Sequence, residues 1–352
     1  MSTKPVPHQG WDTKLDEIHK DLVASVESLV SGEKWKRALE FAARFRTRSF
    51  NNTMLICWQH EAAYRRGRVP EPFPTQVAGF KQWQALGRRV LAGQAGYMIL
   101  APRTARFSTP EPTDPGSWRR LERGERPRPG EVVRPRMIGV RPAYVWDVSQ
   151  TDGAPLPSLP MPHLLSGEAP VGLWDGLADV VRAEGYRLTA ADGSLLGGAN
   201  GVTDFGSRVV QVRSDMDAAA QVKTLAHELA HIRLHDPTTD AAIHRGIGEV
   251  EAESVALIIG AAHGMDTSSY TIPYVSTWAT SVKERTPVEV VQEAGERVRR
   301  AAVAILNLLP TSQVGAGASP GLDRSKITRN AVPTALASLP NGESHRVDAR
   351  SL

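Results

Sequence analysis

The chain has 352 residues, of which 41% are hydrophobic and 23% charged, and its formal net charge is +4. This length and composition indicate a globular protein large enough for two domains. No apolar run is long enough to span a membrane and the N-terminus has no signal-peptide core, so we predict a cytoplasmic protein without a membrane partner. The single cysteine, Cys57, excludes an intramolecular disulfide and a cysteine-rich metal site.

Positive charge is concentrated in the first half of the chain. Residues 33–141 contain about 22 Lys and Arg residues against about nine acidic residues, so the remainder is acidic overall. A basic half joined to an acidic half indicates that the first half meets a polyanion.

Four helices are predicted in the first hundred residues, after a polar, flexible leader over 1–10. Each has apolar residues at a spacing that lines one helix face. They cover residues 11–30, 35–46, 51–67 and 80–86.

Two strands are predicted next, because residues 93–100 and 137–148 alternate between apolar and polar side chains. In the second strand we expect Val140, Tyr144 and Trp146 on the buried face. The intervening residues 103–136 are rich in Pro, Arg and Glu and predict a mobile basic insertion. A solvated insertion without a binding role fits the same composition.

Five segments in this half carry a resemblance by their order. They are SFNNTML (49–55), GFKQW (79–83), GRRV (87–90), GQAGYMIL (93–100) and VWDVSQT (145–151). Together they resemble the N-terminal domain of ArdC-type antirestriction proteins, over residues 11–153. The resemblance implies a single-stranded DNA-binding module followed by a zincin domain. The stretch 103–136 departs from the family core.

Single strands are bound by cations that follow the backbone and by aromatic rings that stack on bases. The candidate DNA-binding residues are Arg46, Arg48, Asn51, Asn52, Lys81, Trp83, Arg88 and Arg89. Tyr97 is a further stacking candidate, although a core position fits Tyr97 and Trp83 equally well, and Phe50 is more typical of a core ring. The asparagines also fit helix capping, and the cations fit a solvated face.

The second half begins after a linker over 154–170, which is rich in Pro, Gly and Ser. We predict a zincin-like domain over 171–310, followed by a disordered tail over 311–352. Its expected elements are a helix over 171–184, a strand over 186–188, a hairpin over 201–212 and a long helix over 287–309. The hairpin offers an edge along which an extended peptide fits.

A metal-binding motif lies between the hairpin and the long helix. His227, Glu228 and His231 form the pattern H-E-x-x-H, which on a helix places both imidazoles on one face, one turn apart. Ser214 and Asp217 predict a capping box before this helix. Glu228 is suited to deprotonate a metal-bound water. A surface helix with two solvated histidines is the alternative for an isolated motif of this kind.

A third ligand is expected, because a catalytic zinc is held by three protein ligands and one water. Glu251, in the next helical run, shares a face with Val255 and Ile258, so we expect it to point inward and complete the site. Glu253 is the alternative. Glu249, near the helix start, is expected to be a solvated charge.

Further polar residues surround the motif in sequence. We expect His235, His244 and His263 to be surface or supporting groups rather than ligands. Tyr270 and Tyr274 are candidates for oxyanion contacts, but stabilisation of the helix pair fits them better.

The sequence HELAHIRLH (227–235), followed by EAESVA (251–256), resembles the zincin peptidases of the ImmA/IrrE type. Gly264 to Tyr270, with Tyr274 and Trp278, continues the resemblance, which covers about residues 198–279. It implies that Glu251 is the third zinc ligand and that the activity is hydrolysis of peptide bonds. Because this half is closer to ImmA/IrrE than to the ArdC zincin, an antirestriction role does not follow automatically.

We therefore predict an α+β protein of two domains with a zinc-dependent metalloendopeptidase centre, in which Zn²⁺ is bound by His227, His231 and Glu251 and Glu228 is the general base. The basic domain brings this centre to single-stranded DNA, and the substrate is an unidentified DNA-associated or regulatory protein. One alternative is an antirestriction-type protein that binds and protects single-stranded DNA, with a structural or vestigial metal site. Another is a metal-dependent regulator that cleaves one repressor.

Overall fold

The computed structural model describes residues 9–29, 32–154, 156, 167–194, 196–235, 245–267, 270, 279 and 285–313, which form a mixed α+β structure. Most of the predicted leader and linker, and the predicted tail beyond residue 313, lie outside the described residues. None of the helices in the described part combines the length and the apolar character needed to cross a membrane.

Three helices begin the chain, close to where the apolar spacing predicts them. They are α1 (Gln9–Glu27), α2 (Gly32–Arg44) and α3 (Phe50–Arg65). The predicted stripe of α1 is buried at Ile18, Leu22 and Val26. Ser49 caps α3 by accepting a hydrogen bond from the backbone of Asn52, which satisfies a free N–H at the helix start.

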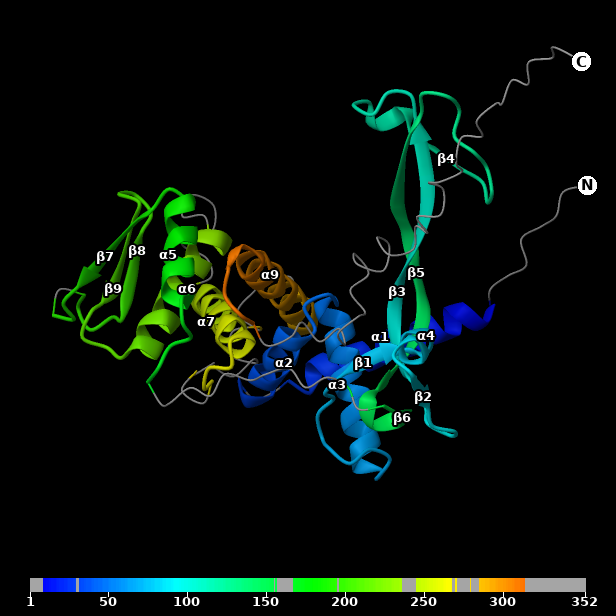
Figure 1. The fold of residues 1–352 in the computed structure, drawn as a ribbon, viewed down its shortest axis with the longest axis horizontal. Coiled ribbons are helices and arrows are strands. Elements are labelled where there is room, and N and C mark those ends of the chain that lie inside the picture. Colours follow the sequence, from blue (N-terminus) through cyan, green and yellow to red (C-terminus); the bar gives the residue numbers. More distant parts are fainter. Residues whose placement is uncertain are drawn as a thin grey trace, which may run out of the picture.

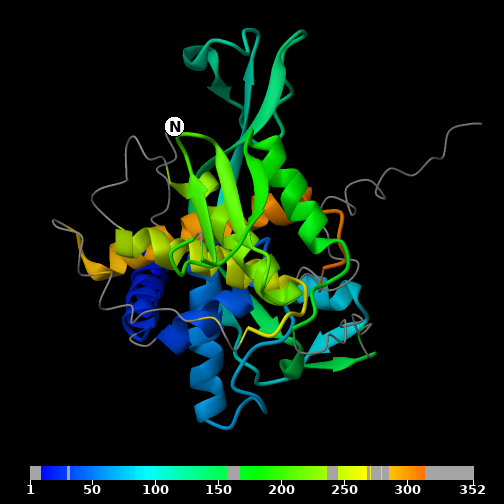
Figure 2. The same cartoon turned by 90° about the vertical axis from the view of Figure 1, so that its left-hand side faces the viewer.

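An antiparallel sheet follows, in the strand order β1-β5-β3-β4. Its strands are β1 (Val77–Gly79), β3 (Tyr97–Thr109), β4 (Arg119–Arg120) and β5 (Val132–Asp147). The outer parts of β3 and β5 leave the body as a long two-stranded ribbon that extends well beyond the helices in both views (Figure 1, Figure 2). We call residues 101–142 the arm.

The arm corrects the prediction of a mobile insertion over 103–136. Residues 104–109 of β3 pair with residues 132–137 of β5, so much of this stretch is strand. These strands could not be predicted from the sequence, because most of their side chains are exposed on both faces of the ribbon. A strand of this kind lacks the alternation of apolar and polar residues that marks a half-buried strand. The buried face of β5 also differs from the prediction. Val145 and Asp147 are buried, whereas Val140 and Tyr144 are exposed.

Short elements complete the N-terminal half. The helix α4 (Phe80–Ala85) packs beside a small sheet of β2 (Arg88–Val90) and β6 (Thr151–Gly153), with the 3-10 turn η2 (Val148–Gln150) before β6. This unit surrounds the buried ring of Trp83.

The C-terminal half contains a three-stranded sheet in the order β7-β9-β8 and a set of helices. The elements are α5 (Leu173–Ala183), β7 (Arg187–Ala191), β8 (Gly201–Asp204), β9 (Val209–Arg213), α6 (Ala218–Leu234), α7 (Arg245–Ala262) and α9 (Pro287–Leu308). β8 is an edge strand, and it lies against α6. α9 begins with a complete capping box between Thr286 and Glu289.

One hydrophobic core joins the two halves of the chain. It contains buried residues of α1, α2 and α3 together with residues of α5, α6, α7 and α9. Trp35 of α2 donates a hydrogen bond from Nε1 to Ser254 Oγ of α7 at 2.9 Å. The ring of Phe50 packs on Gly295 of α9 so closely that an added Cβ would lie 2.6 Å from the ring. The predicted domain boundary therefore does not separate two independent cores.

Candidate metal centre

The helix α6 carries the H-E-x-x-H residues on a well-anchored segment. Asp217 caps the helix by accepting a hydrogen bond from the backbone of Ala220 at 2.8 Å, but Ser214 instead donates to the carbonyl of Ala191. The predicted capping box is therefore replaced by a single aspartate cap. Leu225 and Leu229 are fully buried on the helix and hold it against the core.

Three potential metal ligands converge at one face of α6. In the described part of the chain, the ligand atoms of His227, His231 and Glu249 all lie within 4.8 Å of one another. The Nε2 atoms of the two histidines are 3.0 Å apart. The Glu249 carboxylate lies 3.4 Å from His227 Nε2 and 3.6 Å from His231 Nε2.

These separations fit a divalent metal ion. A tetrahedral ion with bonds of about 2.0–2.1 Å has ligand atoms about 3.3 Å apart, close to the three distances in this cluster. Two imidazoles and one carboxylate are a donor set suited to zinc and to other first-row divalent ions. His227, His231 and Glu249 are therefore the residues that would hold such an ion.

The cluster perturbs both histidines in opposite directions. Burial alone would lower the pKa of His227, but hydrogen bonds to Glu249 and Glu253 outweigh it and raise that pKa to about 9. Burial and the neighbouring charge of His227 lower the pKa of His231. Two Nε2 atoms 3.0 Å apart need either an N–H proton or a metal ion between them.

The structure corrects the predicted third ligand. Glu251 is buried, and its carboxylate accepts a hydrogen bond from Arg297 Nε of α9 at 2.8 Å and lies 3.2 Å from His235 Nε2. Glu249, predicted to be a solvated charge, takes the place beside the two histidines even though its side chain is 66% exposed. The alternative ligand, Glu253, binds Lys223 Nζ at 2.7 Å and lies 3.4 Å from His227 Nδ1.

The correction has a simple physical cause. α7 contacts α6, α9 and α2, so an inward-pointing residue on it can face any of three neighbours. Glu251 points inward as predicted, but toward α9. Glu249 and Glu253 are four residues apart and share the face of α7 toward α6. That spacing was the signal available in the sequence.

His235 supports the centre from behind. Its Nδ1 lies 2.9 Å from His231 Nδ1, and its Nε2 contacts Glu251, which Arg297 holds in turn. Such a chain fixes the ring orientation and tautomer of a metal-binding histidine. His235 is thus placed in the supporting role that was predicted for it.

The other predicted neighbours lie farther from the cluster. His263 is buried and bonds to the Ile259 carbonyl and to Thr311. Tyr270 is buried beneath Lys223, whose Nζ lies 4.2 Å from the ring centroid, so it stabilises the helix pair. His244, Tyr274 and Trp278 lie outside the described residues.

Glu228 lies between α6 and the edge strand β8. Its carboxylate accepts a hydrogen bond from Thr203 Oγ1 at 2.7 Å. Burial raises its pKa, and the Thr203 hydrogen bond opposes that rise. Gly201 is required beside it, because an added Cβ would lie 2.8 Å from Glu228 Oε1. The strand predicted to flank a peptide therefore contacts the predicted general base.

The predicted DNA-binding residues have varied positions. Trp83 is fully buried and donates from Nε1 to the Trp146 carbonyl at 3.0 Å, so it is a core residue. Phe50 and Tyr97 are also buried. None of these three rings has a face available for stacking on a base, which corrects the stacking role proposed for Trp83 and Tyr97.

Several polar candidates have structural partners. The Asn52 side chain bonds to both the N–H and the carbonyl of Leu100, and so completes the edge of β3. Arg48 donates to the Val77 carbonyl, and Arg88 holds Thr151 and Gly153 of β6. Arg46 donates a hydrogen bond to Gln313, and Arg89 forms an ion pair with Asp152. The side chain of Asn51 is half-buried. Lys81 is exposed on α4. Among the eight candidates, Lys81 and Arg89 are the two with exposed side chains, and Trp83 is the one that is buried.

Comparison with known proteins places part of the chain. Residues 13–134 match the family model of the N-terminal domain of anti-restriction factor ArdC. This confirms the resemblance of the N-terminal half, and the matched range includes most of the stretch that was set apart from the family core. The ImmA/IrrE resemblance of the C-terminal half stays a prediction.

Longer matches are more distant. An uncharacterized protein of Bacillus anthracis, pXO2-81, is 24% identical over 313 residues, which cover 84% of this chain and 50% of that protein. The chain thus spans about half the length of this relative. Crystal structures of the antirestriction protein ArdC from plasmid R388 cover 73% of this chain. The metal-free form is 17% identical, with a TM-score of 0.43, and 84% of its chain is covered. The Mn(II)-bound form is 18% identical, with a TM-score of 0.41, and 83% of its chain is covered.

Proposed function

We propose that this protein is an antirestriction-type DNA-binding protein that also holds a divalent metal ion. The match of residues 13–134 to the ArdC N-terminal domain carries this proposal. The excess of Lys and Arg in the same part of the chain supports it, because a polyanion is the partner that such a charge distribution attracts. Single-stranded DNA is the partner proposed for this half.

Metal-dependent peptide hydrolysis is a second candidate function, favoured by the arrangement around α6. His227, His231 and Glu249 would hold the ion, which when bound supplies Lewis-acid polarisation of a carbonyl and of water. Glu228 is the group suited to accept a proton, and Thr203 orients its carboxylate. The edge of β8 offers backbone groups to an extended peptide. Zinc and an endopeptidase activity are part of this proposal.

Two assays on the same pair of proteins test both functions. Affinity for a fluorescent single-stranded oligonucleotide is measured by anisotropy between 50 and 200 mM salt, for the wild type and for Glu228→Gln. Antirestriction is measured as survival of a plasmid entering a restricting host. Single-strand binding that weakens steeply with salt is expected. Absence of binding would contradict the main proposal.

The variant separates the two candidates. If hydrolysis is the function, Glu228→Gln loses the protection while its affinity for DNA is unchanged. If protection depends on binding alone, the variant protects as well as the wild type, and the hydrolytic proposal is withdrawn.

A further inference from the structure

The arm is a narrow two-stranded ribbon, and its length can be estimated from the number of paired residues. Residues 101–109 of β3 pair with β5 as far as Thr109 and Val132. At about 3.4 Å per residue the ribbon is about 30 Å long. It stands away from the helices of both halves (Figure 1, Figure 2). Two of its faces are therefore available to a partner.

Strand register gathers arginines on one of these faces. Directly paired residues share a face, and Phe107 pairs with both Arg134 and Arg120, Ala105 with Arg136, and Ala101 with Arg141. The members of this basic face are Arg103, Arg120, Arg134, Arg136 and Arg141. No acidic residue lies on β3, and on β5 the single one is Asp147 at the end in the body.

A register shift is required for this arrangement. Arg136 and Arg141 are five residues apart, and alternation would place them on opposite faces of a regular strand. The shift between Arg103 and Thr104 of β3 lets β5 advance by two residues, from Gly139 to Met137, where β3 advances by one. The irregularity therefore brings both arginines to the same face.

Aromatic rings, rather than carboxylates, hold two of the arginines. The guanidinium of Arg136 lies 4.4 Å from the ring centroid of Trp118 and 5.5 Å from that of Phe107. Arg134 lies 5.5 Å from the Trp118 ring. Stacking on a ring fixes a guanidinium while leaving its N–H donors and its charge for another partner.

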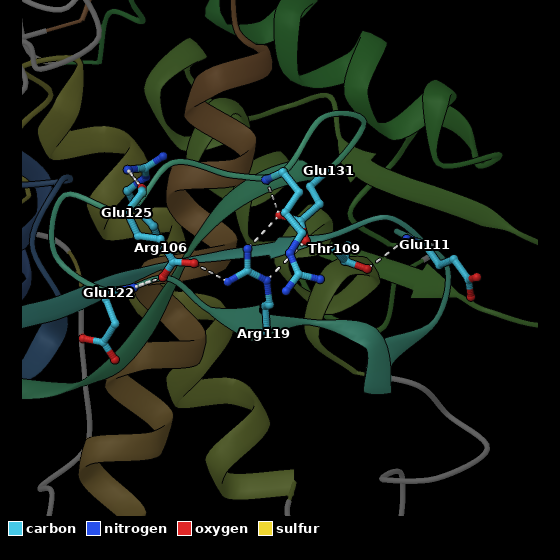
Figure 3. Close-up of polar contacts among 8 residues, drawn as sticks. Arg106, Thr109, Glu111, Arg119, Glu122, Glu125 and Glu131 are labelled. Atoms are coloured by element: carbon cyan, nitrogen blue, oxygen red, sulfur yellow. Dashed lines mark hydrogen bonds and ion pairs between the residues drawn. The ribbon is translucent and has the colours of Figure 1, made fainter.

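The five acidic residues of the arm lie within residues 111–131, at its tip, and two of them pair with the same arginine. Figure 3 shows the side chain of Arg119 between Glu125 and Glu131. Arg119 pairs with Ser108 and so belongs to the face opposite the basic face. Its nitrogen lies 3.0 Å from Glu131, whose side chain is 4% exposed. These two carboxylates face Arg119 and therefore lie away from the basic face.

We propose that the basic face of the arm binds double-stranded DNA, with the ribbon in the major groove and its arginines on the phosphates. The major groove, about 12 Å wide, admits a two-stranded β-ribbon. A single strand instead needs a groove lined with open aromatic faces, and the rings of Phe107 and Trp118 are occupied by arginines. The inference rests on the proposed function in that DNA is the target, but it names a second form of DNA and a separate surface.

The test compares the wild type with two charge-matched triple variants by anisotropy, using a 25-base-pair duplex and one of its strands. The variants are the arm variant, Arg134→Ala, Arg136→Ala, Arg141→Ala, and the control, Arg65→Ala, Arg66→Ala, Arg68→Ala at the exposed end of α3. We expect the arm variant to lose about 10- to 100-fold in duplex affinity and the slope of log K against log salt to fall by about three. The affinity of the arm variant for the single strand should not change. The control should bind both the duplex and the single strand as the wild type does.

Equal duplex affinity of the arm variant and the control would overturn the inference. A third variant, Arg→Lys at the same three positions, keeps the charge. It should keep the salt slope, and a slope as low as that of the alanine variant would show that the loss is structural and overturn the inference as well. A wild type that binds the duplex through the arm but not the single strand would contradict the proposed function and leave the arm inference standing.

Discussion

The metal cluster and the arm both concentrate charge, but they direct it differently. At the cluster, the imidazoles of α6 and the carboxylates of α7 face one another across two packed helices, and Arg297 and Lys223 supply the remaining partners. On the arm, the arginines of the basic face are held by rings and by strand register, and their charges face outward. The first arrangement suits a small cation, and the second suits a large polyanion. Removing a partner should therefore affect ion binding in one region and DNA binding in the other.

The largest effect is expected from Glu249→Ala. Loss of a converging ligand should weaken Zn²⁺ or Mn²⁺ binding by at least about 100-fold, as should His231→Ala. Isothermal titration calorimetry with each metal measures this, with His19→Ala on the exposed face of α1 as a histidine control. If Glu249→Ala binds metal as the wild type does, while Glu251→Ala does not bind it, the ligand predicted from the sequence is correct.

Trp83→Ala should be next, with a loss of about 3–5 kcal/mol in the free energy of unfolding, because a fully buried ring is removed. Urea unfolding measures the loss. The milder Trp83→Phe keeps most of the ring and should bind single-stranded DNA within about twofold of the wild type. A large loss of affinity in a well-folded Trp83→Phe protein would restore its predicted stacking role.

Arg297→Ala should have an intermediate effect. It leaves the buried Glu251 carboxylate without its cation and frees His235, so the metal affinity should fall by about 10- to 100-fold while His227, His231 and Glu249 remain. The matched control is Arg300→Ala, which removes an exposed arginine of the same helix. Equal metal affinities of the two variants would show that the hydrogen-bonded series from His235 through Glu251 to Arg297 has no role in metal binding.

The smallest effect concerns pH at the tip of the arm. Hydrogen bonds from Arg119 and from the Arg128 backbone lower the pKa of Glu131 to about 2. Because this is below the value of about 4.3 in an unfolded chain, the stabilisation is complete above about pH 4.3 and is lost as the pH falls toward 2. A carboxyl titration of Glu131 by NMR checks this, and Arg119→Ala should raise the measured value. Titration of Glu131 near pH 4 in the wild type would contradict the structure.

The sequence predicted those elements whose apolar residues repeat at a regular local spacing. The helices α1, α3 and α9 were predicted close to their observed bounds, because their apolar residues repeat at helical spacing, and Asp217 correctly marked the start of α6. The motif residues of α6 followed from spacing in the same way. The strands of the arm did not, because exposure on both faces removes the alternation that marks a strand, and their pairing joins residues far apart in sequence.

The choice among the glutamates of α7 also lay beyond local pattern. Periodicity placed Glu251 inward, but the neighbour it meets depends on the packing of three helices around α7. Likewise, Asn52 and Arg88 have the chemistry for DNA contact, and only the tertiary structure shows that β3 and β6 use them.

The core shared by the two halves links the stabilities of regions that are distant in sequence. α7 contains Glu249 and also accepts, through Ser254, the hydrogen bond from Trp35 of α2. α9 contains Arg297 and also packs on Phe50 of α3. A ligand that binds only the folded state adds RT ln(1 + [L]/Kd), about 2.7 kcal/mol at a free concentration 100 times Kd. Because these helices share one hydrophobic core, we expect them to unfold together, and an ion bound between α6 and α7 should then raise the melting temperature of the N-terminal helices as well. Metal supply would then alter the stability of the N-terminal half as well.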